Sequence, residues 1–161
     1  MKYKKLLLST VISLFIFTGN SFTAGTSSED NVSKYEKLYK KGALLIKQGK
    51  KLEKKDKTEK AKKKYLRAIK YLEQSNQIEP GKPDTLNYLG FALRKTGNFE
   101  DAEKFYLEGL KIDPKHVGIN EYLGELYIST NRLDKAKERL KILETCNCEE
   151  YSELKNLINQ N

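Results

Sequence analysis

The sequence predicts an all-α protein built as a stack of about seven helices. Charged residues make up 33% of its 161 residues and apolar residues 38%, a balance typical of a helical chain with a real core. Apolar residues recur at the three- and four-residue spacing of a helix face. The whole pattern then recurs after 34 residues, a period typical of paired helices that stack on one another.

The first 25 residues are predicted to be a cleavable signal peptide. Residues 1–5 are positively charged, residues 6–17 form an apolar run, and small and polar residues follow. The run is shorter than the roughly 20 residues that a membrane-spanning helix needs, although an uncleaved anchor remains the alternative. Cleavage is expected after Gly25. We therefore expect a periplasmic or secreted protein whose folded domain covers residues 26–161.

Residues 32–80 are predicted to form a divergent first helix pair. Its first helix is expected over residues 32–52, with Gly42-Ala43 as a Gly-containing signature, and its second helix is recognisable at Tyr65–Ile78. The two helices lie further apart in sequence than those of the later pairs. The extra residues between them are rich in lysine and are interpreted as lengthening both helices into a hairpin that projects beyond the stack.

Two regular units follow, over residues 83–116 and 117–150. The positions that recur after 34 residues include Tyr88, Leu89, Gly90 and Ala102, repeated as Tyr122, Leu123, Gly124 and Ala136. Gly90 has no side chain, so a neighbouring helix can lie close against it. Gly97-Asn98 is expected to turn the chain between the two helices, and Pro114 to end the pair.

This pattern resembles the tetratricopeptide (TPR) family, whose unit is a helix–turn–helix of the same length. In residues 83–116 the matching positions are Leu86, Leu89-Gly90, Leu93, Ala102, Tyr106, Gly109 and Pro114. In residues 117–150, Leu140 replaces the aromatic residue and Cys148 the closing proline. The resemblance implies a right-handed α-α superhelix. A short capping helix is expected within residues 149–161, at Glu149–Asn159, because the last apolar face of a stack needs a cover.

The resemblance also implies a scaffold that binds another protein or peptide. The signal peptide and the Lys/Asn/Ile-rich composition lead us to expect it in the bacterial envelope, and no cofactor is expected. In that family the first helices of each pair line a concave groove. The corresponding residues here are Asp84, Asn87, Phe91, Arg94, Glu121, Glu125 and Ile128. Phe91 would be an exposed anchor, Arg94 a fork for a carboxylate, and the two glutamates a match for a basic segment. Alternatively, Phe91 packs against the long first hairpin.

The lysine-rich stretch carries most of the chain's net positive charge. Its basic surface consists of Lys50, Lys51, Lys54, Lys55, Lys57, Lys60, Lys62, Lys63 and Lys64. One interpretation is a solvated helix end; the other is a docking surface for anionic lipid headgroups or an acidic partner, which would make the protein a membrane-surface tether. Nucleic acid is not expected, because no aromatic residues are interleaved for stacking.

Cys146 and Cys148 are the chain's two cysteines. In an oxidising compartment they predict a structural disulfide; a redox-active pair, a soft-metal site such as Cu(I) and an intermolecular bridge are alternatives. His116, the single histidine, is expected in a surface turn. The sequence contains no nucleophile–base constellation, phosphate loop or metal-ligand cluster, and the prediction is therefore not an enzyme.

Overall fold

The computed structural model describes residues 28–161, and within them the chain forms seven α-helices and no strands. The helices are α1 (Ser28–Glu53), α2 (Thr58–Ile78), α3 (Pro83–Thr96), α4 (Phe99–Ile112), α5 (Val117–Ser129), α6 (Leu133–Leu143) and α7 (Glu149–Asn159). The predicted all-α superhelix of about seven helices is confirmed, as are the bounds expected for the last helix. The predicted signal peptide lies outside the described residues.

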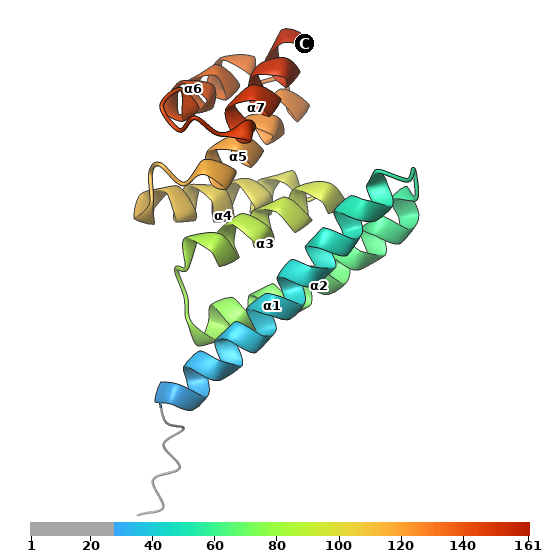
Figure 1. Ribbon diagram of the computed structural model, residues 1–161, viewed down its shortest axis with the longest axis vertical. Coiled ribbons are helices and arrows are strands. Elements are labelled where there is room, and N and C mark those ends of the chain that lie inside the picture. The colour runs from blue at the N-terminus through green and yellow to red at the C-terminus, as the bar shows by residue number, and fades with distance from the viewer. Residues whose placement is uncertain (1–27) are drawn as a thin grey trace, which may run out of the picture.

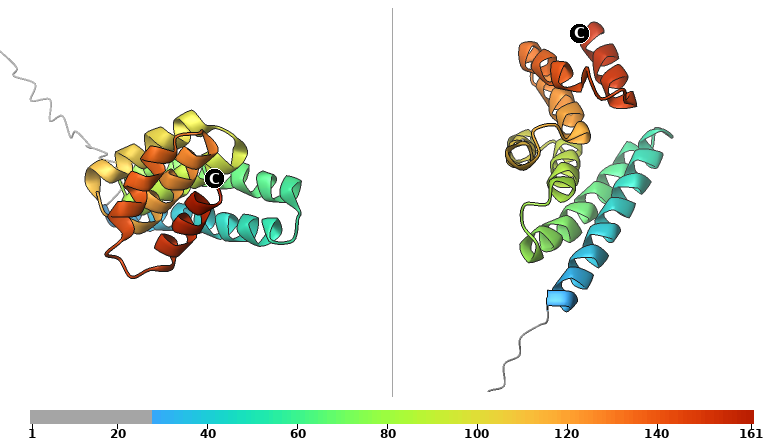
Figure 2. Two further views of the ribbon diagram at one scale, coloured as in Figure 1. Left: turned by 90° about the horizontal axis from the view of Figure 1, so that it is seen from above. Right: turned by 60° about the vertical axis from the view of Figure 1, so that its left-hand side comes forward.

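Three helix pairs stack in chain order. α1 packs on α2, α3 on α4 and α5 on α6, and each pair is rotated relative to the one before it (Figures 1 and 2). The first helices of successive pairs also touch one another, α1 with α3 and α3 with α5, and α7 continues this row against α5. We call the surface along α1, α3, α5 and α7 the inner face.

Each pair turns through one residue with a left-handed backbone. These residues are Asp56 (φ 56°), Gly97 (φ 92°) and Asn131 (φ 56°). Glycine and, to a smaller extent, asparagine and aspartate tolerate this conformation, which ends the first helix and releases the chain into the second. The turn predicted at Gly97-Asn98 is confirmed, and the Asn98 side chain accepts a hydrogen bond from the Asp101 amide of α4.

The first pair follows the same register as the second, which corrects the sequence-based interpretation. Gly49, Ala61 and Tyr65 each lie 41 residues before Gly90, Ala102 and Tyr106. A Cβ atom on either glycine would collide with the tyrosine ring of its own pair. The prediction of extra residues between α1 and α2 was wrong, because Gly42 is not the equivalent of Gly90.

The extra length of the first pair lies at the opposite end from its turn. α1 has 26 residues and α2 has 21, against 14 in α3 and 14 in α4. Both helices are therefore elongated as predicted, but the extra turns are not in the lysine-rich stretch where the sequence placed them. The added turns pack on one another: Ser75 of α2 donates a hydrogen bond to the Tyr35 carbonyl of α1, at 3.2 Å. The Tyr35 hydroxyl lies 3.1 Å from the Thr85 hydroxyl and joins the extension to α3.

The helix α7 seals the C-terminal end of the stack. Leu154 is fully buried and Ile158 is 9% exposed. Leu154 lies where a side chain on Gly124 would otherwise stand, with its Cδ2 only 2.6 Å from the position of a Cβ. This close contact covers the apolar face of α5, as expected of a terminal helix in a solenoid.

Candidate functional site

The inner face carries three equivalent positions from the three pairs, Lys50 on α1, Phe91 on α3 and Glu125 on α5. Lys50 lies 41 residues before Phe91, which lies 34 residues before Glu125. Tyr122 and Arg94 join them to form one group of side chains, which we call the inner cluster. The superhelical stacking brings these residues together, although they are far apart in sequence.

Two aromatic rings form the centre of the inner cluster. The centroids of Phe91 and Tyr122 are 4.9 Å apart, and the two planes are tilted by 56°. The Lys50 ammonium lies 5.5 Å from each ring centroid and donates a hydrogen bond of 3.1 Å to the Tyr122 hydroxyl. A cation at this distance is attracted to the negative face of an aromatic ring. Lys50 is thereby held over the inner face while it stays exposed to solvent.

The buried Arg94 side chain also contacts both of these rings. Its guanidinium carbon lies 5.6 Å from the Phe91 centroid and 5.7 Å from that of Tyr122. It is 9% exposed and forms an ion pair of 2.8 Å with Glu125. Burial would lower the pKa of Arg94, but Tyr106 and Glu125 outweigh it and raise that pKa. Arg94 therefore remains charged, and its ion pair with Glu125 stabilises the packing of α3 against α5.

Glu121 is a buried acid at the junction of α5 and α7. It is 2% exposed, and its surroundings raise its pKa from 4.5 to about 9. Burial is the largest cause of this pKa shift, and hydrogen bonding with Glu153 of α7 and the negative charges of Glu125, Glu153 and Glu150 contribute the rest. Since the carboxyl group keeps its proton at neutral pH, it presents no negative charge there.

The structure places the seven predicted groove residues in different environments. Phe91 is 3% exposed and packs edge-on against Tyr65 at 5.6 Å. The interpretation of Phe91 as an exposed anchor is therefore wrong, and the alternative, packing against the first hairpin, is correct. Asn87 is buried and Ile128 half-buried, whereas Asp84 is exposed and lies 3.1 Å from His116 Nε2. A role for these seven residues in partner binding stays a prediction.

The structure adds three residues to the accessible part of the inner face. Tyr39 of α1 and Tyr88 of α3 are half-buried, with ring centroids 5.8 Å apart. Lys50 was assigned to the basic surface by the sequence, but its ammonium turns away to the inner cluster. The signal for it was present, because the repeat of Gly49, Ala61 and Tyr65 places residue 50 in line with Phe91.

The other predicted lysines follow the hairpin. Lys64 is half-buried and donates a hydrogen bond of 2.8 Å to Gln48, and the rest are exposed. They do not all share one face: Lys51, Lys55, Lys57 and Lys64 line one hollow between α1 and α2, and the others lie outside it.

Cys146 and Cys148 form a disulfide in the turn before α7. Both are half-buried, and Cys146 packs against the C-terminal core. The predicted bridge is thus present, and its position ties the end of α6 to the start of the capping helix. A redox role for the pair stays a prediction.

His116 has a structural role. Its Nδ1 accepts a hydrogen bond from the Ile119 amide at 3.2 Å and so caps the first turn of α5.

Among residues 28–161 no group of three or more His, Cys, Asp or Glu side chains is arranged to hold a metal ion. In the same range, no helix combines the length and the apolar character that crossing a membrane requires.

Comparison with known proteins gives a match over one repeat. Residues 83–116 match the family described as "Tetratricopeptide repeat". These residues form a tetratricopeptide repeat. The matched range is the first regular unit of the sequence. A curated relative, the TPR repeat-containing thioredoxin TTL4 of Arabidopsis thaliana, is 22% identical over 131 residues; the match covers 81% of this chain but only 17% of that relative.

Solved structures share the fold over most of the chain. The type III secretion chaperone SycD of Yersinia enterocolitica, in complex with a peptide of the translocator YopD, has a TM-score of 0.61 at 18% identity, covering 80% of this chain and 88% of that one. The first TPR of Spaghetti (RPAP3), bound to an HSP90 peptide, has a TM-score of 0.55 at 20% identity, covering 75% and 92%. The structure is a TPR superhelix.

Proposed function

We propose that this TPR protein is a non-catalytic scaffold of the bacterial envelope that binds a segment of another protein on its inner face. The observation that carries the proposal is Lys50. Its ammonium is exposed above Phe91 and Tyr122, and it has no ion-pair partner within residues 28–161. The similar structures of SycD and RPAP3 were solved with bound peptides, which supports peptide binding by this fold.

The inner face favours a partner segment with an acceptor group opposite Lys50. A carboxylate or a backbone carbonyl would accept a hydrogen bond from the ammonium, while Tyr39 and Tyr88 would cover the neighbouring part of the segment. Arg94 is already paired with Glu125, and Glu121 is uncharged at neutral pH. The partner segment is therefore anionic or neutral at this point, in place of the basic segment that the two glutamates suggest from the sequence alone.

Site-specific photo-crosslinking in cells tests the inner face as the binding surface. A photoreactive residue replaces Tyr88 on the inner face, and a matched variant carries it at Leu107, an exposed position on α4. We expect a distinct adduct from position 88 and none from position 107. Adducts from position 107 alone, or the same adducts from both positions, would contradict the proposal.

The adduct also provides the partner for a direct affinity measurement. The variant Lys50→Gln should weaken binding of the identified partner about tenfold, because a charge-assisted hydrogen bond contributes roughly 1.5–3 kcal/mol. Lys54→Gln, at an exposed position in the turn directly after α1, is the matched control and should bind like the wild type. Equal affinities of the Lys50→Gln variant and the wild type would remove Lys50 from the site.

Export is part of the proposal and rests on residues 1–25. Mass spectrometry of the protein recovered from the periplasm or the medium should give a mature chain that begins at Thr26. A protein that retains residues 1–25 and stays in the cytoplasm would contradict export while leaving the inner-face experiments unaffected.

A further inference from the structure

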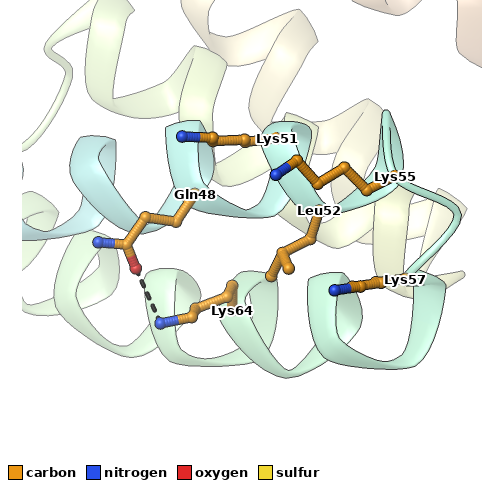
Figure 3. A pocket seen from close by; sticks show the side chains of 6 residues that line it. All are labelled: Gln48, Lys51, Leu52, Lys55, Lys57 and Lys64. Atoms are coloured by element: carbon orange, nitrogen blue, oxygen red, sulfur yellow. Dashed lines mark hydrogen bonds between the residues drawn. The ribbon is translucent and has the colours of Figure 1, made fainter.

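The first helix pair has an outer face that no other helix covers within residues 28–161. We call this surface, on the side of α1 and α2 away from α3, the end face. Two shallow hollows of about 290 and 340 Å³ lie along it, and both are lined by Gln48 and Lys64. They are therefore parts of one groove between α1 and α2. The hollow nearer the turn is shown in Figure 3, with Leu52 at its floor.

Basic side chains line both sides of the groove. They are Lys41 and Lys51 from α1, Lys55 and Lys57 from the turn between the two helices, and Lys64 and Arg67 from α2. None of the six forms an ion pair within the described part of the chain; the ion pairs that α1 makes there join Glu36 to Lys40 and Glu53 to Lys95. No acidic side chain lines either hollow. The two hollows therefore contain no compensating negative charge, unlike the surroundings of Arg94 on the inner face; Asp56 and Glu59 lie beside Lys57 at the turn.

The end face also presents apolar surface between the charges. Leu44 is 55% exposed, the most exposed of the large apolar side chains of residues 29–161. Tyr71 lies half-buried beside it, and the Lys41 ammonium is 5.5 Å from its ring. An exposed leucine surrounded by lysines, next to an aromatic ring with a polar tip, is the composition of helices that lie on membrane surfaces.

The geometry points to a lipid bilayer with anionic headgroups as the ligand of this face. We propose that the end face binds such a bilayer, with the lysines at the headgroup phosphates and Leu44 inserted at the interface. Lys41 and Lys51 are about 15 Å apart along α1, at roughly 1.5 Å per residue. That distance exceeds the Debye length of about 8 Å at physiological salt, so one compact anionic group cannot neutralise both.

A bilayer fits this charge distribution better than an acidic protein segment. Five of the six cations are lysines, which carry compact, strongly hydrated charges on flexible stems and make no fixed two-pronged contact. They form two rows along antiparallel helices, and a surface of many headgroups can meet both rows at once. An acidic helix would offer one narrow line of carboxylates. The inner face remains free in this orientation, so the proposal does not depend on partner binding.

Co-sedimentation with vesicles tests the proposal. The protein expressed from its full sequence is mixed with vesicles of phosphatidylcholine alone or of phosphatidylcholine and phosphatidylglycerol in equal parts. We expect binding to the anionic vesicles that falls as salt is added, and a much lower partition on phosphatidylcholine. All variants are recovered with the same N-terminus, so differences between them report on the end face.

Two charge variants separate the end face from overall net charge. The end-face variant is Lys51→Gln, Lys55→Gln and Lys57→Gln; the control variant, with the same loss of charge at exposed positions of α4 and α6, is Lys111→Gln, Lys137→Gln and Lys141→Gln. The partition coefficient of the end-face variant should fall on the order of 100-fold, as three lysines near an anionic surface imply. The control should change less than tenfold.

A second pair of variants tests the apolar contact. Leu44→Ser should reduce partition severalfold at constant charge, whereas Leu107→Ser, at a position 43% exposed on α4, should not. Equal losses in the two charge variants, equal partition on both kinds of vesicle, or binding to a polyglutamate peptide with no binding to anionic vesicles would each overturn the proposal.

Discussion

Replacement of Glu121 by glutamine is expected to stabilise the protein at neutral pH. Glu121 is 2% exposed, and burial together with Glu153 raises its pKa from 4.5 to about 9. Glutamine has nearly the same shape and is always neutral. The variant therefore resembles the protonated form of the native side chain. Its folded state is not destabilised by having to keep a proton that the unfolded chain would release at neutral pH.

The magnitude follows from the difference between the two pKa values. Above pH 4.5 the unfolded chain releases the Glu121 proton while the folded chain keeps it up to about pH 9, so unfolding becomes progressively more favourable as the pH rises. Each pH unit in this window costs about 1.4 kcal/mol. Between pH 4.5 and pH 7 the loss is about 3 kcal/mol, and Glu121→Gln should recover it.

Urea unfolding at a series of pH values measures the effect. The free energy of unfolding of Glu121→Gln should exceed that of the wild type by about 3 kcal/mol at pH 7, with little difference near pH 4. Glu108→Gln, at an exposed position on α4, should follow the wild type throughout. A difference between Glu121→Gln and the wild type that does not change with pH would refute the reasoning, because a purely steric effect has no pH dependence.

Three further substitutions test the packing, each by urea unfolding. Gly90→Ala should cost about 2 kcal/mol because its methyl group meets the ring of Tyr106, and an unchanged midpoint would contradict that close approach. Arg94→Ala should cost about 3 kcal/mol because it leaves Glu125 without its partner, and the second substitution Glu125→Ala should recover part of this cost. Leu154→Ala should cost about 3 kcal/mol by uncovering α5, and a cost below 1 kcal/mol would show that α7 is not a seal.

The repeated part of the fold could be predicted from the sequence because its local signals agree with one another. Gly90, the turn at Gly97 and the closing Pro114 each have a physical role that a single sequence displays. The capping helix was predictable for the same reason, since a stack must cover its last apolar face.

The first pair was harder to predict because two glycines compete for one role. Both Gly42 and Gly49 face a large side chain of α2, Leu72 and Tyr65 respectively. Spacing within the pair distinguishes them, since only Gly49 has an alanine and a tyrosine at the distances found after Gly90. Comparison of the pairs at a fixed period of 34 hides this match.

Burial on the inner face depended on tertiary contacts that no local pattern displays. Phe91 is covered because the first helix pair lies close enough for Lys50 of α1 and Tyr65 of α2 to reach it. Glu121 is buried by α7, which the sequence places only as a cap. The protonation state of Glu121 follows from that burial, and it reverses the charge that the residue type suggests.

The two ends of the stack differ, and this difference restricts how copies of the protein can associate. A head-to-tail contact would need an open apolar surface at both ends, but Leu154 and Ile158 of α7 already occupy the C-terminal one. A two-fold contact between first pairs would place the lysines of the end face against identical lysines, and repulsion opposes it. The architecture therefore disfavours both a growing filament and a symmetric dimer through the two ends of the stack.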